Sequence, residues 1–149
     1  MQDLKRVAIL GCTGSIGTQA LDVCRQHADK LSVVALSAHS RTSDLAMFAR
    51  EFGVARVAVT DPDHFDDASL CDLPDACSLY KGSQAAIDIC MHEDVDIVLV
   101  SIVGAAGLSA TYQLIAAGKQ VALANKESLV VGGDLIMPLA THETLLPVD

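Results

Sequence analysis

The chain has 149 residues, of which 51% are hydrophobic but only 3% aromatic, and its formal net charge at pH 7 is −9. This length fits one domain with a substantial core packed from small aliphatic side chains. The negative charge argues against binding to nucleic acid or to an anionic membrane, since both need a basic surface. Any phosphate group that this chain binds must therefore be held by local groups.

The cysteines and the N-terminus indicate a cytoplasmic protein. The five cysteines are odd in number and include no Cys-x-x-Cys pair, so they predict neither a disulfide framework nor a zinc site. The N-terminal residues carry an acid and precede an apolar run that is too short for a signal peptide. Residues 97–118 are uncharged over a membrane-spanning length, but their glycines and polar side chains predict a strand, a loop and a helix instead.

Apolar runs and amphipathic segments alternate along the chain, without an internal repeat or an obvious linker. The pattern predicts strands at residues 6–10, 32–37, 56–60, 96–102 and 120–124, and helices at 15–26, 43–52, 83–91, 108–117 and 129–140. Residues 61–76 are acidic and rich in turn formers, and we expect a surface excursion with little order there. The alternation predicts an α/β fold, a doubly wound Rossmann-like parallel sheet with helices on both faces, which binds its ligand at the carboxyl ends of the strands.

The first predicted strand runs directly into a glycine-rich turn, Gly11-x-x-Gly14-x-x-Gly17, and then into an amphipathic helix. In nucleotide-binding turns, glycines allow a tight turn, a close approach of the backbone to a pyrophosphate and close packing of helix on strand. The amides at the helix start then face the anion. The spacing is a variant of the usual Gly-x-Gly-x-x-Gly, and an ordinary strand-to-helix loop is the alternative interpretation.

The loop after the second predicted strand bears on the choice of cofactor. An NAD-specific site usually has an Asp or Glu there to accept the adenosine ribose hydroxyls, whereas this chain reads Ala38-His-Ser-Arg-Thr-Ser43. Arg41, with the hydroxyls of Ser40 and Thr42, offers charge-assisted hydrogen bonds to a 2′-phosphate. The sequence therefore favours NADP(H). A solvated arginine in front of a helix capped by Ser43 is the alternative.

Two further segments follow predicted strands at the same edge of the sheet. Ser101-Ile-Val-Gly-Ala-Ala-Gly107 predicts a flexible loop with few side chains, on which a flat ring can lie close to the backbone. Asn125, Lys126 and Glu127 follow the last strong strand, where the reactive end of a cofactor would lie and Lys126 can pair with an anionic substrate. A helix start capped by Asn125 explains the same residues equally well.

Four motifs in this order closely resemble the 1-deoxy-D-xylulose 5-phosphate reductoisomerase family, and the resemblance covers the whole chain. The motifs are Gly11-Cys-Thr-Gly-Ser-Ile-Gly17 followed by Leu21-Asp-Val23, Ile102-Val-Gly-Ala-Ala-Gly-Leu108, Leu123-Ala-Asn-Lys-Glu-Ser-Leu129 and Leu145-Leu-Pro-Val-Asp149. The resemblance implies an oxidoreductase that isomerises 1-deoxy-D-xylulose 5-phosphate and reduces the product with NADPH to 2-C-methyl-D-erythritol 4-phosphate, in non-mevalonate isoprenoid biosynthesis. It also implies that the full-length protein is a homodimer.

Residue roles follow from the same resemblance. The glycine turn, with Gly11, Thr13, Gly14, Ser15, Ile16 and Gly17, would bind the NADPH phosphates. Asn125 and Glu127 would lie along the cofactor, and Lys126 would meet the substrate. Asp149 would be the first ligand of a Mg²⁺ or Mn²⁺ ion that polarises the substrate carbonyl, since carboxylate oxygen suits these hard cations. Many relatives have Gly, then Lys or Arg, then Asn where this chain has His39-Ser40-Arg41, so the cation stands one position later here.

The chain stops at the first residue of the family's Asp-Ser-Glu-His motif, so we expect residues 1–149 to be an NADPH-binding domain cut at the start of the catalytic domain. With a single metal-binding carboxylate, it is expected to bind NADPH but to be inactive alone. Another NADP-linked reductase and a non-catalytic nucleotide-sensing module are the alternatives. A short-chain dehydrogenase needs Tyr-x-x-x-Lys, but Tyr80 is followed four residues later by Gln84, and Tyr112 by Ala116.

Overall fold

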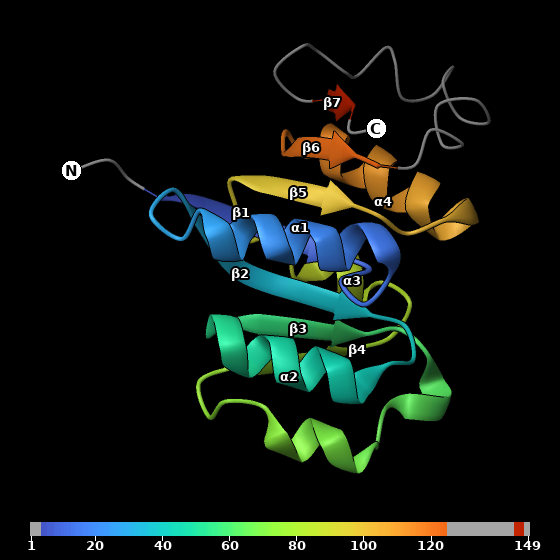
Figure 1. The fold of residues 1–149 in the computed structure, drawn as a ribbon. Helices are drawn as coiled ribbons and strands as arrows, with labels where there is room; N and C mark the ends of the chain where they lie inside the picture. Colours follow the sequence, from blue (N-terminus) through green and yellow to red (C-terminus); the bar gives the residue numbers. More distant parts are fainter. Residues whose placement is uncertain (1–3, 125–144, 148–149) are drawn as a thin grey trace.

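Parallel strands form the centre of the structure, a computed structural model that describes residues 4–124 and 145–147 (Figure 1). The strands are Lys5–Leu10 (β1), Leu31–Ala38 (β2), Arg56–Val59 (β3), Ser78–Lys81 (β4), Ile97–Val100 (β5), Gln120–Leu123 (β6) and Leu145–Pro147 (β7). They form one seven-stranded sheet in the order β4-β3-β2-β1-β5-β6-β7. Each pair of neighbours is parallel, which confirms the predicted α/β class.

Helices cover both faces of this sheet, as predicted. They are Ser15–Gln26 (α1), Thr42–Phe52 (α2), Ala85–Asp88 (α3) and Gly104–Ala116 (α4), with two short 3-10 helices at Pro62–His64 (η1) and Ala68–Asp72 (η2). In Figure 1, α1 and α2 lie in front of the sheet, and α3 and α4 lie behind it. Because the helices lie on the two faces, the end of the sheet at the carboxyl termini of its strands is available to a ligand.

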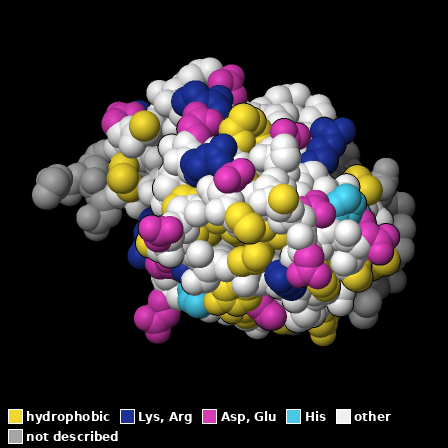
Figure 2. Space-filling model, turned by 90° about the horizontal axis from the view of Figure 1, so that it is seen from below, with side chains coloured by type: hydrophobic (Ala, Val, Ile, Leu, Met, Phe, Trp, Pro, Cys, Tyr) yellow, Lys and Arg dark blue, Asp and Glu magenta, His cyan; other side chains and the backbone are white. Residues whose placement is uncertain are grey.

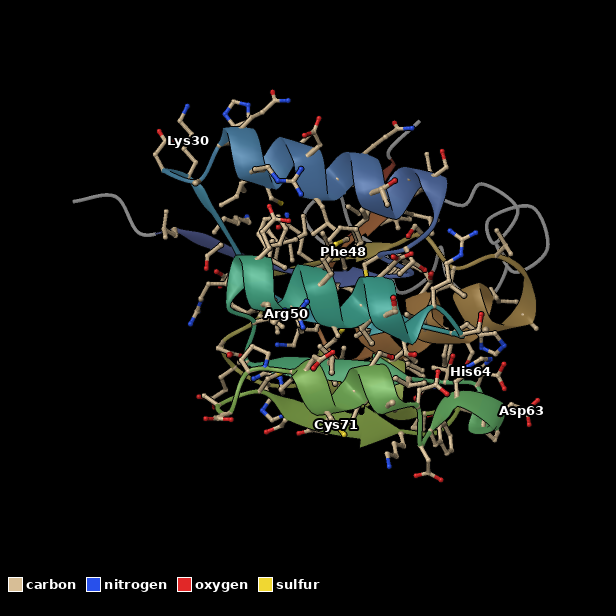
Figure 3. All side chains as sticks on the ribbon, turned by 60° about the horizontal axis from the view of Figure 1, so that its bottom comes forward. Lys30, Phe48, Arg50, Asp63, His64 and Cys71 are labelled. Carbon is tan, nitrogen blue, oxygen red and sulfur yellow. The ribbon has the colours of Figure 1, made fainter. Side chains whose placement is uncertain are left out.

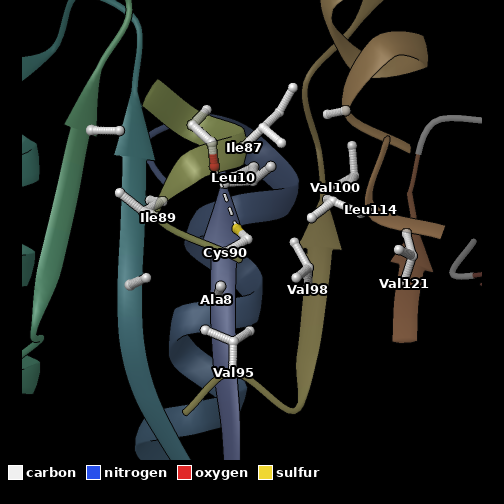
Figure 4. Close-up of a cluster of buried hydrophobic side chains, with 14 of the residues drawn as sticks. Ala8, Leu10, Ile87, Ile89, Cys90, Val95, Val98, Val100, Leu114 and Val121 are labelled. Carbon is white, nitrogen blue, oxygen red and sulfur yellow. Dashed lines mark hydrogen bonds between the residues drawn. The ribbon is translucent and has the colours of Figure 1, made fainter. Parts of the chain in front are cut away.

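The central strand β1 contributes to a separate hydrophobic core on each face. Val7 and Ile9 pack in the core beneath α1 and α2, whereas Ala8 and Leu10 pack in the core with α3 and α4. Successive side chains of a strand point to opposite faces, so a strand that is covered on both sides reads as a continuous apolar run. Figure 4 shows the second core, in which the Cys90 thiol donates a hydrogen bond to the carbonyl oxygen of Ala86.

Two predictions about the middle of the chain were wrong. Residues 61–76 were expected to have little order, but they contain η1 and η2, and η2 packs against α2. Strand β4 was missed, because an edge strand with exposed Ser78 and Lys81 gives no continuous apolar run. The acidic composition of this segment masked its order, since local patterns do not reveal packing against a distant helix.

The boundaries of three helices also differ from the prediction. Helix α3 spans four residues, where residues 83–91 were predicted to be helical. Helix α4 begins at Gly104, so most of the expected flexible loop 101–107 is the first turn of a helix. Helix α2 begins at Thr42, with Arg41 in place of Ser43 at its N-cap. The helix predicted at 129–140 lies outside the described residues.

One face of the molecule carries side chains of both charges. Figure 2 shows the face at the β4 end of the sheet, on which acidic side chains are interspersed with Lys and Arg.

Helix α4, which includes much of the uncharged run in the sequence, has 13 residues. Among residues 4–124 and 145–147, we find no helix with the length and apolar character needed to cross a membrane.

Candidate functional site

A cavity of about 760 Å³ opens at the carboxyl ends of the strands. It lies where the sheet order reverses, because the chain leaves β1 toward β2 but later returns to the other side of β1 to form β5. Ligands of open α/β sheets bind at such a switch point. The cavity is lined by Gly11, Thr13, Gly14, Ser37, Ala38, His39, Thr60, Ser83, Gln84, Ala86, Ile87, Ser101, Ile102, Val103, Ala105, Ala106, Ser109 and Ala110.

The three glycines of the turn differ in whether the structure requires glycine at their positions. Gly11 has a φ of +78°, which favours glycine, and a Cβ there would also lie 3.1 Å from the Ser101 Oγ. A Cβ on Gly17 would overlap the Gly11 carbonyl oxygen and lie 2.7 Å from the Cys12 Cα, so α1 can pack this closely on β1 only with glycine. Gly14 has a φ of −81°, and its Cβ would meet the Gly11 carbonyl oxygen at an ordinary 3.7 Å. Neither the backbone conformation nor packing against residues 4–124 and 145–147 explains glycine at position 14.

The helix starts at the cavity are open to an anion. Gly14 is the N-cap of α1, no acid lies in the first turn of this helix, and no side chain of the described residues caps it. Helix α4 begins after Val103 in the same way, without a capping side chain or an acid in the first turn. The amides of a first helical turn have no partner within the helix and carry partial positive charge. The arrangement therefore favours a negatively charged ligand.

Two buried or partly buried serines hold the glycine turn from neighbouring strands. The Ser37 Oγ, at the end of β2, accepts a hydrogen bond from the Gly11 N–H at 3.0 Å, and the Ser37 carbonyl accepts one from the Cys12 N–H at 2.9 Å. The Ser101 hydroxyl, after β5, donates to the Leu10 carbonyl at 2.6 Å and lies 3.2 Å from the Gly11 carbonyl oxygen. Sequence reasoning missed Ser37, although a serine at the end of an apolar strand was an available signal.

The cysteine within the turn has a structural role. Cys12 is fully buried, and burial raises the pKa of its thiol to about 12. A thiol with such a pKa stays protonated near neutral pH and is a poor nucleophile. The small size of Cys12 is therefore sufficient reason for its place between β1 and α1.

The loop after β2 reaches the glycine turn through its arginine. The Arg41 Nη1 donates a hydrogen bond to the Thr13 carbonyl oxygen at 3.3 Å, so the two predicted phosphate-binding segments are adjacent. Ser40 and Arg41 also line a second, open cavity of about 490 Å³. The expected role of the Thr42 hydroxyl was wrong, because this side chain is 3% exposed and donates its hydrogen to Asp67.

The remaining candidates lie outside the described residues. Asn125, Lys126 and Glu127 follow the end of β6, and Asp149 is the last residue of the chain. Within the described part of the chain, no group of three or more His, Cys, Asp or Glu side chains is arranged to hold a metal ion.

Comparison with known proteins identifies the family. The sequence model of the family described as 1-deoxy-D-xylulose 5-phosphate reductoisomerase matches residues 7–133. The chain belongs to this family. Among similar reductoisomerases, that of Phocaeicola vulgatus is 46% identical over 149 residues, and that of Acinetobacter baumannii strain SDF is 45% identical over 147 residues. These alignments cover 97% and 96% of this chain but only 38% and 37% of the two relatives.

Solved structures of reductoisomerases share the fold described above. The enzyme of Zymomonas mobilis in complex with NADPH superposes with a TM-score of 0.88 at 37% identity, over 99% of this chain and 39% of that chain. A reductoisomerase in complex with NADPH, fosmidomycin and magnesium gives 0.85 at 39% identity, over 97% of this chain and 36% of that chain. A biliverdin reductase from Synechocystis sp. PCC 6803 gives 0.63 at 22% identity, which shows a common fold alone.

Proposed function

We propose that residues 1–149 bind NADPH and act as the cofactor domain of a 1-deoxy-D-xylulose 5-phosphate reductoisomerase. The observation that carries the proposal is Gly14, which lies at the cavity and at the start of α1. Neither its backbone conformation nor its packing within the described part of the chain requires glycine. A ligand that approaches the backbone closely at this position would explain why the residue is glycine. Solved reductoisomerases of the same fold that contain NADPH support this reading.

The pyrophosphate of NADPH would lie on the glycine turn. Thr13, Gly14, Ser15 and Ile16 would bind it through the amides at the start of α1, while Gly11 and Gly17 shape the turn. The chain has a net charge of −9, so these local amides must provide the attraction for the pyrophosphate. Their arrangement at the switch point fits that task.

The adenosine 2′-phosphate would bind to Arg41 and Ser40. Arg41 lies close enough to the glycine turn to donate a hydrogen bond to the Thr13 carbonyl. Arg41 and Ser40 both line the open cavity beside α2. The guanidinium offers charge-assisted hydrogen bonds to a phosphate, which NADH lacks at this position. This assignment predicts a preference for NADPH over NADH.

For the whole enzyme, the family suggests conversion of 1-deoxy-D-xylulose 5-phosphate to 2-C-methyl-D-erythritol 4-phosphate by a cytoplasmic homodimer that binds neither nucleic acid nor membrane. Asn125 and Glu127 would then lie along the cofactor, Lys126 would meet the phosphorylated substrate, and Asp149 would provide the first ligand for Mg²⁺ or Mn²⁺. A hard divalent cation takes about six oxygen ligands, so one carboxylate is a poor site. We therefore expect the 149-residue polypeptide to bind NADPH without turning over substrate.

Calorimetric titration with NADPH and NADH tests this proposal. The Arg41→Ala variant should bind NADPH about tenfold or more weakly, since a hydrogen bond to a charged group contributes about 1.5–3 kcal/mol, and should bind NADH as before. Arg50→Ala is the matched control. Arg50 lies in the last turn of α2, the helix whose N-cap is Arg41, and it pairs with Asp72. Failure of the unaltered chain to bind either nucleotide would refute the function. An equal effect of Arg41→Ala on both nucleotides would refute the 2′-phosphate assignment.

A further inference from the structure

A hydrogen-bond network ties the acidic segment between β3 and β4 to the start of α2. The Asp67 Oδ2 accepts a hydrogen bond from the Thr42 hydroxyl at 2.5 Å and lies 2.8 Å from the His64 Nδ1. The Ser69 hydroxyl lies 2.8 Å from the Thr42 Oγ1. Figure 3 shows His64 on η1, beside the N-terminal end of α2. One carboxylate thus connects η1 with the first residue of the helix.

The anchored residue is the immediate neighbour of Arg41. Thr42 is 3% exposed, so its buried hydroxyl depends on the Asp67 carboxylate and the Ser69 hydroxyl for its hydrogen bonds, and Asp67 is the charged partner of the two. The Arg41 carbonyl accepts the Leu45 N–H at 3.1 Å, which fixes the backbone of Arg41 to the same helical turn. The guanidinium then extends to the Thr13 carbonyl of the glycine turn. The position of this side chain therefore depends on where Thr42 is held.

We propose that Asp67 is a positioning residue for Arg41 and, through it, for the discrimination of NADPH from NADH. The carboxylate holds Thr42, and Thr42 sets the point from which the loop after β2 presents the guanidinium to the adenosine 2′-phosphate. The inference rests on the proposed function, since it assumes that the chain binds NADPH with Arg41 at this phosphate. A displacement of about 1 Å is enough to weaken a directed contact substantially.

Electrostatics alone would predict the opposite effect of removing Asp67, so an experiment can distinguish positioning from charge. A carboxylate in the same cavity as Arg41 repels a phosphate, so removing its charge should strengthen NADPH binding if charge were all that mattered. His64 offsets this repulsion: its hydrogen bond to Asp67 raises the pKa of the imidazole, and the bonds from Thr42 and His64 lower the pKa of the carboxyl. The pair therefore favours the oppositely charged forms, which reduces the net negative charge beside Arg41.

The test compares the dissociation constants of NADPH and NADH in variants of the 149-residue chain. Asp67→Ala should lower the preference for NADPH by about threefold to tenfold, in the range of coupling between residues that share a network. Asp67→Asn retains an oxygen that can accept from Thr42 and should keep most of the preference. Asp66→Ala is the control, because it removes the same charge from the same segment, and the Asp66 side chain is 98% exposed and lies 3.5 Å from the Lys81 Nζ.

A double-mutant cycle separates positioning from general damage to the fold. In an Arg41→Ala background, Asp67→Ala should leave the ratio of the two dissociation constants unchanged. An unchanged or increased NADPH preference in Asp67→Ala, or a loss that persists without Arg41, overturns the inference while the proposed function stands. If Asp67→Ala does not fold, the isosteric Thr42→Val breaks the same link and should give the same loss. A wild-type chain that binds neither nucleotide overturns the proposed function and this inference together.

Discussion

Substitution of Gly17 by alanine should destabilise the fold itself. The added Cβ would overlap the carbonyl oxygen of Gly11 and would lie 2.7 Å from the Cα and 2.9 Å from the carbonyl carbon of Cys12. All of these are backbone atoms in the turn between β1 and α1, so they cannot move aside as a flexible side chain would. Overpacking of this kind costs about 3 kcal/mol. For a chain of this size, that lowers the melting temperature by roughly 6–12 °C.

Gly14→Ala is the matched variant, in which the same methyl group is added three residues earlier. Among the described residues, the nearest contact of this methyl group would be the Gly11 carbonyl oxygen at 3.7 Å, and the φ of −81° is ordinary for alanine. We expect the free energy of unfolding to change by less than about 1 kcal/mol. NADPH binding should weaken by about tenfold or more, because the methyl group occupies the space that the pyrophosphate needs.

Thermal unfolding followed by circular dichroism, together with calorimetric titration with NADPH, measures both effects. The reasoning predicts a dissociation between them, with stability lost in Gly17→Ala and binding lost in Gly14→Ala at nearly unchanged stability. A Gly14→Ala variant that binds NADPH as tightly as the unaltered chain would show that the turn does not contact the pyrophosphate. A Gly17→Ala variant with an unchanged melting temperature would show that α1 does not pack on β1 as closely as described.

Two further predictions concern titratable groups. The hydrogen bonds from Arg6 hold the pKa of Asp96 below its usual value, so this carboxylate stabilises the fold above about pH 4 and the stabilisation is lost as the pH falls through its lower folded-state pKa. Urea unfolding between pH 5 and pH 2 should therefore show a shallower loss of stability for Asp96→Asn, and parallel curves would contradict this. Burial raises the pKa of Cys12 and Cys90 to about 12, so mass spectrometry after alkylation of the native chain at about pH 8 should find them unmodified and the exposed Cys71 modified. Modification of Cys12 at the rate of Cys71 would show that the turn is open to solvent.

The glycine turn is a part of the structure that the local sequence pattern was sufficient to predict. The run from β1 through Gly11 to α1 was predicted with nearly correct boundaries, because an apolar strand, a turn glycine and an amphipathic helix each leave a signal within a few residues. Strand β4 and the start of α4 were missed for the converse reason. A four-residue edge strand with exposed ends and a helix start made of Gly and Ala are weak local signals, and packing against neighbours stabilises them.

The sequence by itself determined the α/β class, the glycine turn between the first strand and the first helix and, through its motifs, the family. These properties follow from residue types over short spans, since hydrophobic periodicity and glycine placement act locally. The tertiary structure alone decided which distant residues support the turn and the start of α2. Ser101 reaches it from 90 residues away, and Asp67 anchors Thr42 from 25 residues away. Such contacts depend on strand order and crossovers, which bring chain segments together irrespective of their separation in sequence.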